Sequence, residues 1–532
     1  MYDVIVVGSG ASGSWASKEL CERGLKVLML EAGRSIDVER EFSVKPGRQG
    51  LLPTRLDSAL RGQHLQARCA NFAAHTSHFY VNDRQNPYSY PRGKPFYWFR
   101  GRQMGGRLHT WCRAALRMSD AELKPSEHGR EGPDWPLTYQ EIEPYYDKVE
   151  MYLGLLGERA DVPGLPDGRY SDPMPLTRLE RRFLEKTEGT AGGIRAMSGR
   201  IIRHNPRRIP LPILAATRTG NLTIQSNAAV SHLVMDPETG RARGVAYVDC
   251  LSKIWREEAA KAVVLCASAF ESVRILLNSV SPRHPGGVGN SSGLLGRGIT
   301  DHLMIGLRGR MPDARWEPEP LEDKDPFDFG VNGLYLQAPA AKRGGGTGAS
   351  RAFGIQCGIG RGSPNWWMLA FGEMSPAPSN RLSIDATRRD AWGIPAARIE
   401  CAHSPDDEAQ IAVMRDTILT LAGLERFEVV MPYDEKNLAG VAFKALRRVV
   451  FSPTGAFWPG ASVHEVGGAR MGSSPRDSVL DPSNRCWDAP NVVVCDGASF
   501  VRSGYQNHTL TIMAQTVRAC EHLVAAAKKG DL

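Results

Sequence analysis

The sequence of 532 residues contains no apolar stretch that approaches the length of about 18 residues needed to cross a bilayer. The chain enters a strand-like run at residues 2–7, and no basic segment or cleavage site precedes that run. These absences predict a cytoplasmic protein without a membrane span. Such a protein would leave the cell only with a partner that carries a secretion signal.

Long runs of like charge are also missing. Lys and Arg total 66 and Asp and Glu total 58, which gives a formal net charge of +8, but the charges are scattered along the chain. A nucleic-acid-binding protein normally gathers its positive charge in a patch or stripe. The sequence therefore does not support a nucleic-acid partner.

Metal-binding and disulfide patterns are absent as well. The ten cysteines show no CxxC pair and no His/Cys cluster at zinc spacing, and the chain has no HExxH motif. We therefore expect reduced, buried thiols and no metal centre. The composition, with 42% hydrophobic and 23% charged residues, is that of an ordinary globular protein and excludes a disordered or collagen-like chain.

The first 31 residues predict a strand, a glycine-rich turn, a helix and a second strand. Residues 4–7 form an apolar, β-branched run of the kind that parallel sheets bury on both faces. Residues 14–23 predict a helix that ends at Gly24, and residues 26–31 predict the next strand. The N-terminus is therefore expected to be a βαβ unit.

The turn of this unit carries Gly8, Gly10 and Gly13, and Glu31 ends the second strand. In a dinucleotide-binding fold the first glycine allows the tight turn, the second lets a pyrophosphate approach the backbone, and the third lets helix and strand pack closely. The N–H groups of the helix would face the phosphates, and Glu31 would accept hydrogen bonds from ribose hydroxyls. The pattern predicts dinucleotide binding without separating FAD from NAD.

Further along the chain, short strand signals alternate with poorly patterned segments. Residues 34–95 are expected to form an irregular arm or loop, and residues 138–154 predict a helix with an early proline. Residues 304–455 indicate a largely antiparallel second domain, with a glycine-rich loop at 342–348. The remaining strands and a final helix are expected at residues 222–225, 231–235, 244–249, 262–266, 491–496 and 510–528.

Three segments near the C-terminus carry a more specific pattern. One places His464 before the run Gly467-Gly468-Ala-Arg-Met-Gly, the next is residues 491–500, and the third reads Gln-Asn-His-Thr-Leu-Thr from residue 506. Together they resemble the glucose–methanol–choline (GMC) oxidoreductases, a family of FAD-dependent alcohol oxidases and dehydrogenases. The resemblance puts the two active-site polar residues of the family at His464 and Asn507. His508 stands where members often have proline, so the chain departs from the pattern there.

Other segments extend the resemblance over most of the chain. Residues 105–111 resemble the glycine-rich stretch that passes the flavin, and residues 264–277 resemble a second signature, with Ala267 in place of a frequent glycine. The segment 290–297 and the pair Asp301-His302 follow in the usual order. Asp-Trp-Pro at 134–136 and Pro-Tyr-Tyr at 144–146 are similar to a bacterial branch that includes pyranose oxidases and glycoside 3-dehydrogenases. The resemblance is weakest over residues 34–95 and 304–455.

The mode of flavin attachment depends on one position in the glycine-rich stretch. Several pyranose oxidases attach their flavin to a histidine just before the tryptophan of this region. Here Thr110 holds that position and His109 lies one residue earlier. We therefore expect FAD to be bound non-covalently.

Oxidation of an alcohol removes a proton from oxygen and a hydride from carbon, and the flavin takes the hydride at N5. The protein must then supply a base beside the hydroxyl. An imidazole suits this task because its ordinary pKa of about 6.5 leaves it largely neutral at pH 7. We expect His464 to be the base and Asn507 to hydrogen-bond the same hydroxyl oxygen. His508 either turns away from the flavin and binds a carbonyl group, or shares the proton with His464.

The resemblance also implies which residues surround the cofactor. Asp496, at the end of a strand, would meet the ribityl and diphosphate part of FAD or cap the next turn, and Val230 would contact the adenine. The expected cofactor-binding residues are Gly8, Gly10, Ala11, Ser12, Gly13, Glu31, Ala32, Gly105, Gly106, His109, Thr110, Val230, Ala267, Asp496, Gly497, Asn507, His508 and Thr509.

The expected fold class is therefore α/β. A Rossmann-like FAD-binding domain would comprise residues 1–303 and 456–532, and a mainly antiparallel β-sheet substrate-binding domain carrying helices would comprise residues 304–455. Four side chains of the second domain would either bind a sugar or pack in the core, and these are Trp366, Trp367, Phe371 and Glu373.

The leading hypothesis is FAD-dependent oxidation of a secondary hydroxyl of a sugar or glycoside, at C3 or C2 of a pyranose, to a keto sugar. Reduced flavin would pass its electrons to O2 or to a quinone or cytochrome partner, and a homo-oligomer or a small partner subunit is compatible with the sequence. The alternatives are a GMC-type lyase with structural FAD, an oxidase of a non-sugar alcohol, and a non-catalytic flavoprotein subunit, which the intact pair His464 and Asn507 disfavours. A nicotinamide-dependent reductase would need a second GxGxxG motif, which is missing.

Overall fold

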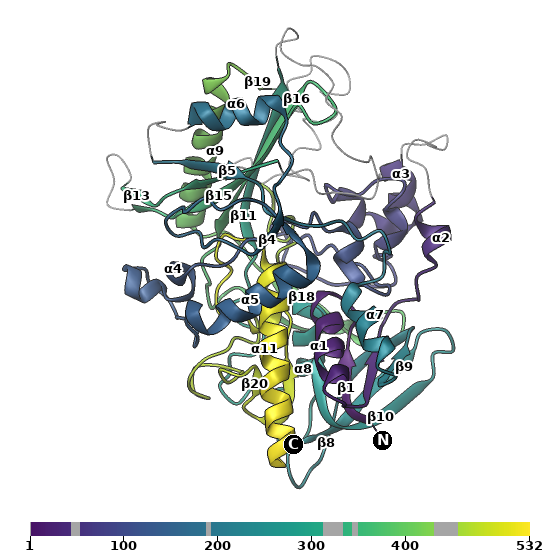
Figure 1. The fold of residues 1–532 in the computed structure, drawn as a ribbon. Coiled ribbons are helices and arrows are strands. Elements are labelled where there is room, and N and C mark those ends of the chain that lie inside the picture. The colour runs from purple at the N-terminus through teal and green to yellow at the C-terminus, as the bar shows by residue number, and fades with distance from the viewer. Residues whose placement is uncertain are drawn as a thin grey trace.

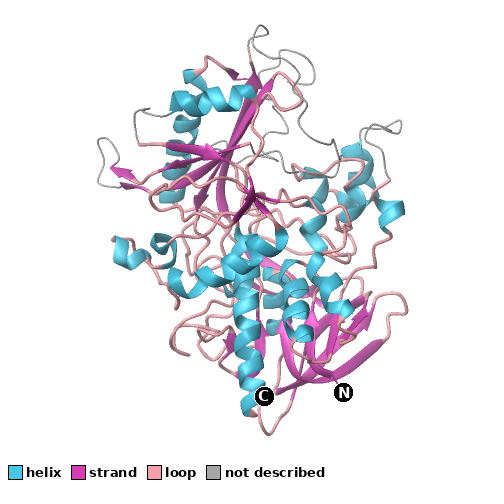
Figure 2. Cartoon of the chain, viewed as in Figure 1, coloured by secondary structure: helices cyan, strands magenta, loops and turns pink. Residues whose placement is uncertain are grey.

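The computed structural model describes residues 2–43, 54–187, 193–311, 333–342, 349–429 and 456–531. Within these ranges the chain forms two large β-sheets, one of eight and one of six strands, with helices packed around them. Figures 1 and 2 show the first sheet at the lower end of the molecule, near both termini, and the second at the upper end. Residues 343–348 of the expected glycine-rich loop lie outside the described residues.

The N-terminal βαβ unit is present. It consists of β1 (Tyr2–Val7), α1 (Ala11–Glu22) and β2 (Val27–Leu30), and the two strands pair in parallel. The expected start of the helix at residue 14 is wrong by three residues. Gly10 is the N-cap, so the glycine turn passes directly into the first turn of α1.

The C-terminus completes the sheet that the N-terminus begins. The strand order is β20–β21–β10–β1–β2–β7, and β8 and β9 form an antiparallel extension on β10. β10 pairs in parallel with β1 on one side and with β21 on the other. The ranges are β7 (Leu222–Gln225), β8 (Ala228–Met235), β9 (Ala242–Asp249), β10 (Trp255–Leu265), β20 (Arg485–Cys486) and β21 (Ala489–Val494).

Helices from distant parts of the chain cover this sheet. α11 (His508–Lys529) packs against α1 and against α5 (Tyr139–Leu153), and α7 (Leu211–Arg218) packs on the other side of α1. Figure 1 shows α11 running beside α1, with both chain ends at the bottom. The predicted helix at 138–154 is α5, which Thr138 caps and which contains Pro144 near its start.

The second sheet is antiparallel throughout, in the order β19–β11–β16–β15–β12–β5. The mixed fold of a doubly wound sheet and an antiparallel sheet is the predicted α/β class. Two helices pack on the second sheet, α6 (Arg178–Thr187) and α9 (Pro405–Leu424). Its strands are β5 (Arg195–Ser198), β11 (His302–Arg310), β12 (Leu334–Ala338), β15 (Phe353–Ile359), β16 (Asn365–Glu373) and β19 (Glu428–Val429).

The two halves exchange elements across the expected domain boundary. β5 comes from residues before 303, and the hairpin of β17 (Arg381–Arg389) and β18 (Pro395–Glu400) packs against α8 (Ala269–Asn278). The division at residues 303 and 456 stays a prediction. Smaller elements are α2 (Val38–Glu41), α3 (Thr54–Ser58), α4 (Asp120–Leu123), β3 (Leu155–Leu156), β4 (Tyr170–Asp172), β6 (Ile201–Ile202), β13 (Ala341–Lys342) and β14 (Ala349–Ser350).

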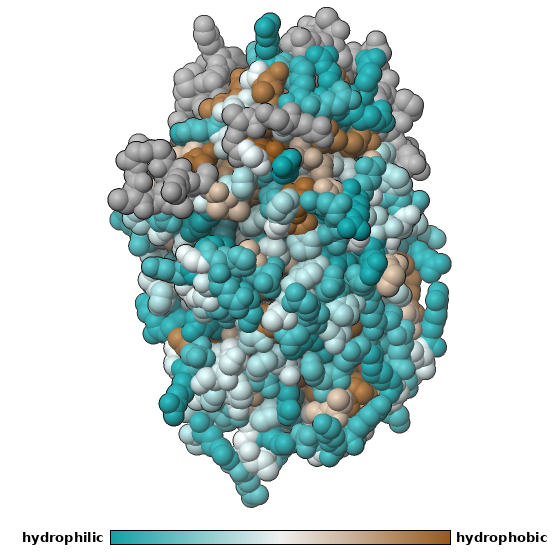
Figure 3. Space-filling view, turned by 60° about the vertical axis from the view of Figure 1, so that its left-hand side comes forward, coloured by the Kyte–Doolittle hydropathy of each residue, from teal (hydrophilic) through white to brown (hydrophobic). Residues whose placement is uncertain are grey.

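All ten cysteines are free thiols, and eight of them are buried. In the described ranges, no group of three or more His, Cys, Asp or Glu side chains is arranged to hold a metal ion. No helix in those ranges has both the length and the apolar character required to cross a membrane. The face seen in Figure 3 is largely hydrophilic, with apolar residues gathered mainly in its upper part.

A buried carboxylate joins the first helix to the rest of the molecule. Glu19 of α1 has no exposed side-chain surface, and its carboxylate pairs with Lys148 of α5 at 2.8 Å and with Arg23. Arg23 also pairs with Glu521 of α11 at 2.9 Å. Charges from three helices therefore meet at Glu19.

We expect Glu19→Gln to lower the free energy of unfolding by about 2 kcal/mol, because the amide leaves three cations, Lys18, Arg23 and Lys148, without their buried anion. Urea unfolding followed by circular dichroism measures this difference. The matched control is Glu22→Gln on the same helix, whose partly exposed pair with Lys18 is worth about 0.5 kcal/mol or less. Equal losses in the two variants would contradict the assignment of Glu19 as an anchor.

Candidate active site

The three glycines of the first turn differ in what surrounds them. A Cβ on Gly8, which has φ +100°, would lie 2.4 Å from the carbonyl oxygen of Cys266, and a Cβ on Gly13 would lie 1.9 Å from that of Gly8. A Cβ on Gly10 would meet no atom within 4 Å. Gly8 and Gly13 are therefore required by close packing of strand and helix, whereas Gly10 faces open space.

Glu31 fastens this turn to the end of β2. Its carboxylate accepts hydrogen bonds from the backbone N–H groups of Ser9 (3.1 Å) and Gly33 (2.7 Å) and from the Ser9 hydroxyl. Burial raises the pKa of Glu31 despite these three bonds. The predicted contact of Glu31 with a ribose stays a prediction.

Ser9 brings a second glycine stretch to the same place. The Ser9 hydroxyl accepts a hydrogen bond from the N–H of Gly105 at 3.0 Å. A Cβ on Gly106 would have only the Cα of Gly10 within 4 Å, at 3.7 Å. Gly10 and Gly106 therefore line one open region beside the N-terminus of α1.

This region fits the diphosphate of FAD. No side chain caps α1 at Gly10, and no acidic residue lies in its first turn, so no side chain of the helix itself neutralises the partial positive charge of its N-terminus. The other expected residues lie at the first turns of α1 and α11, after β2 and β10, on β8 and at the end of the glycine stretch. These are Ala11, Ser12, Thr509, Ala32, Ala267, Val230 and Thr110.

His109 is held within an aromatic cluster. Its Nε2 donates to the carbonyl oxygen of Met104 at 2.7 Å, and its ring stacks on Phe79 with centroids 5.2 Å apart. Burial lowers the pKa of His109 to about 4, so the ring is neutral at pH 7. His109 also borders a cavity of about 100 Å³ that Trp111 and Met513 help to line.

Asp496 caps the short helix formed by Gly497–Ser499. Its carboxylate accepts from the N–H of Ala498 at 3.0 Å and from the Ser272 hydroxyl. Burial raises its pKa to about 6. The structure thus contains the cap that was one of the two expected roles, and a contact with FAD stays a prediction.

Asp301 holds the loop that carries His464. Its carboxylate accepts from the N–H groups of Gly460 (2.7 Å), Ser462 (3.3 Å) and His464 (3.0 Å) and from the Ser462 hydroxyl. Val463, in the middle of this loop, has φ +63°, a conformation that a β-branched residue rarely adopts. The concentrated hydrogen bonding explains how the loop keeps that backbone conformation.

Arg107 holds the other side of the same loop. Its guanidinium donates to the carbonyl oxygen of Val463 at 3.1 Å and pairs with Glu465 at 2.9 Å. Burial lowers the pKa of His464 well below 6.5, and the charges of His508 and Arg107 lower it further. A neutral imidazole, which a proton acceptor must be, is therefore the stable form of His464.

The predicted pair, His464 and Asn507, is brought together at the centre of a longer polar chain. Nδ2 of Asn507 lies 3.2 Å from Nε2 of His464, and Nδ1 of His464 lies 2.9 Å from Nδ1 of His302 on β11. On the far side, Nε2 of Gln356 on β15 donates to Oδ1 of Asn507 at 2.6 Å. The antiparallel sheet thus supplies both ends of the chain.

His508 binds a carbonyl group, as in the first of its two expected roles. Its Nε2 donates to the carbonyl oxygen of Ser503 at 2.7 Å, and its ring lies 5.4 Å from that of His464. Burial lowers its pKa to about 4. No hydrogen bond joins the two rings, so the structure gives no path for a shared proton.

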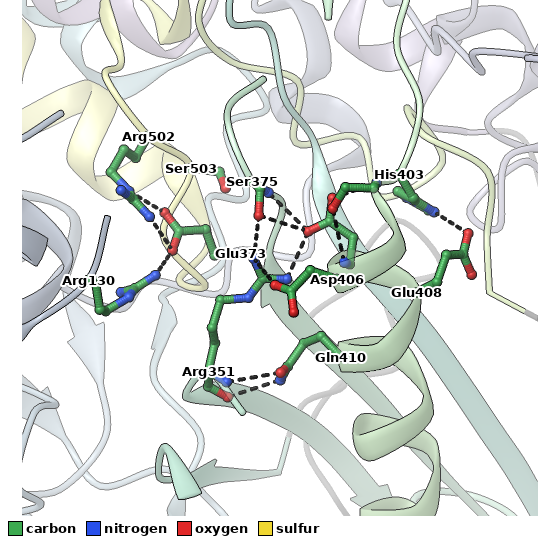
Figure 4. A network of polar contacts seen from close by, with 12 residues as sticks. Arg130, Arg351, Glu373, Ser375, His403, Asp406, Glu408, Gln410, Arg502 and Ser503 are labelled. Atoms are coloured by element: carbon green, nitrogen blue, oxygen red, sulfur yellow. Dashed lines mark hydrogen bonds and ion pairs between the residues drawn. The ribbon is translucent and has the colours of Figure 1, made fainter. Parts of the chain in front are cut away.

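The aromatic residues of β16 divide between core and site. Trp366 is fully buried and donates to the backbone of Glu428, whereas Phe371 lies 5.4 Å from the His464 ring. Glu373 is bound by Arg130 and by Arg502 at 2.7 Å (Figure 4). The expectation that Glu373 could bind sugar hydroxyls is therefore not supported, because two guanidiniums occupy its carboxylate.

Sequence reasoning missed several residues that shape this site. The pair Asp301-His302 had a signal, since it fits the family pattern, but no role had been assigned to it. Arg107 lies within the recognised glycine stretch, where a charged residue among glycines could have been noticed. Gln356 gave no signal, because a single polar residue in an apolar strand is indistinguishable from many others.

Two segments of this chain match the GMC oxidoreductase family. Residues 209–304 match the N-terminal part of the family model, and residues 376–516 match the C-terminal part. Both matches contain residues described above, the first Val230 and His302 and the second His464 and Asn507.

The chain is 27% identical to 2-methyl-1,2-propanediol dehydrogenase of Mycolicibacterium austroafricanum, over 98% of this chain and 95% of that protein. It is 25% identical to C-glycoside 3-oxidase of Microbacterium trichothecenolyticum, over 98% and 96% of the two chains. Among solved structures, pyridoxine 4-oxidase from Mesorbium loti has the same fold, with a TM-score of 0.63, 17% identity and 99% of each chain covered.

We expect Gly10→Val to fold but to lose its cofactor, because its Cβ would meet no atom within 4 Å and the side chain would extend into the open region. Flavin absorbance of the purified protein reports cofactor content, and a thermal melt reports folding. Gly13→Val is expected to misfold, because its Cβ alone would clash with the Gly8 carbonyl. The control is Gly423→Ala, at a helical glycine that also faces open space. A yellow Gly10→Val protein would contradict the placement.

We expect acid to destabilise the protein partly through His109. An unfolded histidine takes up a proton near pH 6.5, whereas buried His109 resists it to about pH 4. Its stabilising effect is therefore complete above about pH 6.5 and is lost as the pH falls through this window, by about 2 kcal/mol at pH 5. His109→Gln keeps a donor for the Met104 carbonyl but does not titrate. Its drop in stability between pH 7 and pH 5, measured by urea unfolding, should be smaller than that of the wild type; an equal drop would refute the assignment.

Proposed function

The chain belongs to the GMC oxidoreductase family, which binds FAD and acts on alcohol or sugar substrates, and we propose that it oxidises a secondary hydroxyl of a sugar or glycoside, at C3 or C2 of a pyranose. The observation that carries the proposal is the distance of 3.2 Å between His464 Nε2 and Asn507 Nδ2. At that distance a neutral proton acceptor, His464, and a hydrogen-bond donor, Asn507, can contact the same hydroxyl group. A hydroxyl at that point can give its proton to the first while its oxygen accepts from the second.

His464 is the proposed base. Its lowered pKa keeps the ring neutral at pH 7, so that one ring nitrogen can accept a proton, and the Asp301 and Arg107 contacts fix the loop so that the ring is not free to turn away. Asn507 is the proposed partner of the substrate oxygen. Its amide donates a hydrogen bond that becomes stronger as negative charge develops on that oxygen.

The residues around Gly10, Gly106 and the N-terminus of α1 would hold FAD. When bound, FAD supplies the acceptor for the hydride that leaves the carbinol carbon. Non-covalent attachment is supported by His109, whose Nε2 already binds the Met104 carbonyl and whose ring is stacked on Phe79. The electrons would pass on to O2 or to a quinone or cytochrome partner.

The choice of a sugar rests on the likeness to C-glycoside 3-oxidase and on the Asp-Trp-Pro and Pro-Tyr-Tyr patterns. The likeness to a propanediol dehydrogenase favours a second candidate, the oxidation of a small non-sugar alcohol. Both candidates use the same base. They differ in the substrate that reduces the flavin.

The test is anaerobic mixing of the purified flavoprotein with glucose, methyl β-D-glucopyranoside, an aryl C-glucoside and 1,2-propanediol, followed by flavin absorbance. We expect a pyranoside to bleach the flavin, and the keto position of the product, found by NMR, to be C3 or C2. Bleaching by the diol alone would favour the second candidate. No bleaching by any alcohol would overturn both and favour a lyase with structural FAD.

The role of His464 has its own test. His464→Ala should retain FAD and slow flavin reduction by about 100-fold or more, because the base is lost while the cofactor site is intact. The control is His284→Asn, at a histidine that hydrogen-bonds Ser281 in the segment after α8. If His464→Ala reduced its flavin as fast as the wild type, another group would have to be the base.

A further inference from the structure

The polar chain through the site ends at a buried histidine that the reaction has not yet used. His302 is the first residue of β11 and is 2% exposed, and its Nδ1 faces Nδ1 of His464 at 2.9 Å. The two rings stand nearly edge to face, with planes 73° apart. One proton must lie between the two facing nitrogens, because two lone pairs or two N–H groups at that distance would repel each other.

The direction of the chain follows from its Gln356 end. Nε2 of Gln356 donates to Oδ1 of Asn507, so the NH2 group of Asn507 is the group that faces Nε2 of His464. An NH2 group can only donate, so Nε2 of His464 holds the lone pair and Nδ1 carries the ring proton. Nδ1 of His302, which faces that N–H, then has a lone pair.

The same direction is consistent at the other end. With Nδ1 of His302 as acceptor, Nδ1 of His464 is the donor, and Nε2 of His464 is left with its lone pair. That lone pair meets the NH2 group of Asn507, whose oxygen is occupied by the donor Nε2 of Gln356. Donors and acceptors alternate correctly from Gln356 to His302, and reversing any ring would place two donors or two acceptors in contact.

We propose that His302 is a positioning residue that selects the tautomer of His464, by accepting its Nδ1–H and so keeping the lone pair on Nε2, the nitrogen that Asn507 faces and that would accept the proton of the substrate hydroxyl. The proposal rests on the proposed role of His464 as base. His302 takes the place that a carboxylate fills in Ser-His-Asp triads, where the acidic partner orients the base and supports its positive charge.

A neutral orienting group suits this location. The surroundings already hold the Arg107–Glu465 ion pair and the carboxylate of Asp301, and a further buried carboxylate would be costly to ionise. When the O–H bond of the substrate breaks, the proton would form a bond to Nε2 of His464, and bound FAD would supply the acceptor for the hydride. His464 becomes a cation whose Nδ1–H is still bound by His302. No further reactant is needed.

The first experiment needs no substrate. Histidine labelled with 15N is incorporated into the holoenzyme, and the ring nitrogens of His464 and His302 are assigned by their loss in His464→Asn and His302→Asn. We expect a protonated Nδ1 and an unprotonated Nε2 on His464, and the opposite pattern on His302. A protonated Nε2 on His464 at pH 7 overturns the proposal, whatever the substrate is.

The second experiment measures anaerobic flavin reduction by methyl β-D-glucopyranoside, or by the diol if only the diol bleaches the flavin. His302→Leu removes the acceptor and should slow reduction by about 100-fold, with FAD content and the flavin spectrum unchanged. His302→Asn carries an acceptor, Oδ1, at the position of Nδ1 and should stay within about 10-fold of the wild type. Equal rates for the leucine variant and the wild type, or equally slow leucine and asparagine variants, contradict the proposal.

The control for loss of a buried histidine is His403→Leu. The His403 side chain is 3% exposed and pairs with Glu408 in the same half of the molecule (Figure 4). It should reduce its flavin at the wild-type rate. If His302→Leu does not fold, the asparagine variant and the NMR result decide. If no alcohol reduces the wild-type flavin, the proposed function fails, and the tautomer pattern still tests His302.

Discussion

The parallel pairing of β10 with β1 on one side and with β21 on the other is the constraint on which the rest of the molecule depends. It brings residues 2–7 and 489–494 into one sheet and so places the glycine turn after β1 beside the chain that follows β21. The helices after these strands, α1 and α11, then pack against each other. Asn507 and His508 lie at the start of α11, so the same pairing decides where the expected active-site residues are.

Buried carboxylates hold the loops of this site in place. Glu31 binds the turn after β1, Asp301 binds the loop before His464, and Asp496 binds the turn after β21. Each accepts backbone N–H groups, which a loop otherwise leaves without partners away from water. Burial still raises the pKa of Asp301 and Asp496 to about 6. These anions are therefore costly to bury, and the compensation lies in the fixed loop geometry.

Burial also disfavours the charged form of the histidines of the site, so their rings are neutral. His302, His464 and His508 lie close together, and burial and their mutual repulsion lower the pKa of His302 and His464 well below 6.5. In a cluster of neutral imidazoles, the tautomer of one ring decides which nitrogen of the next ring donates, and no charge is added. The charge state and the tautomer of the proposed base, His464, therefore depend on the neighbouring side chains as well as on the imidazole itself.

The sequence by itself determined the βαβ unit, the glycines that close packing requires, the cofactor class and the pair His464 and Asn507, because each depends on local spacing or on a motif. It also predicted the antiparallel character of the second sheet. The tertiary structure alone decided that Gln356 and His302, from β15 and β11, hold that pair from both sides, and that Arg130 and Arg502 occupy Glu373. The physical reason is that hydrogen-bond partners 150 or more residues apart are set by strand register, and register has no local signature in the chain.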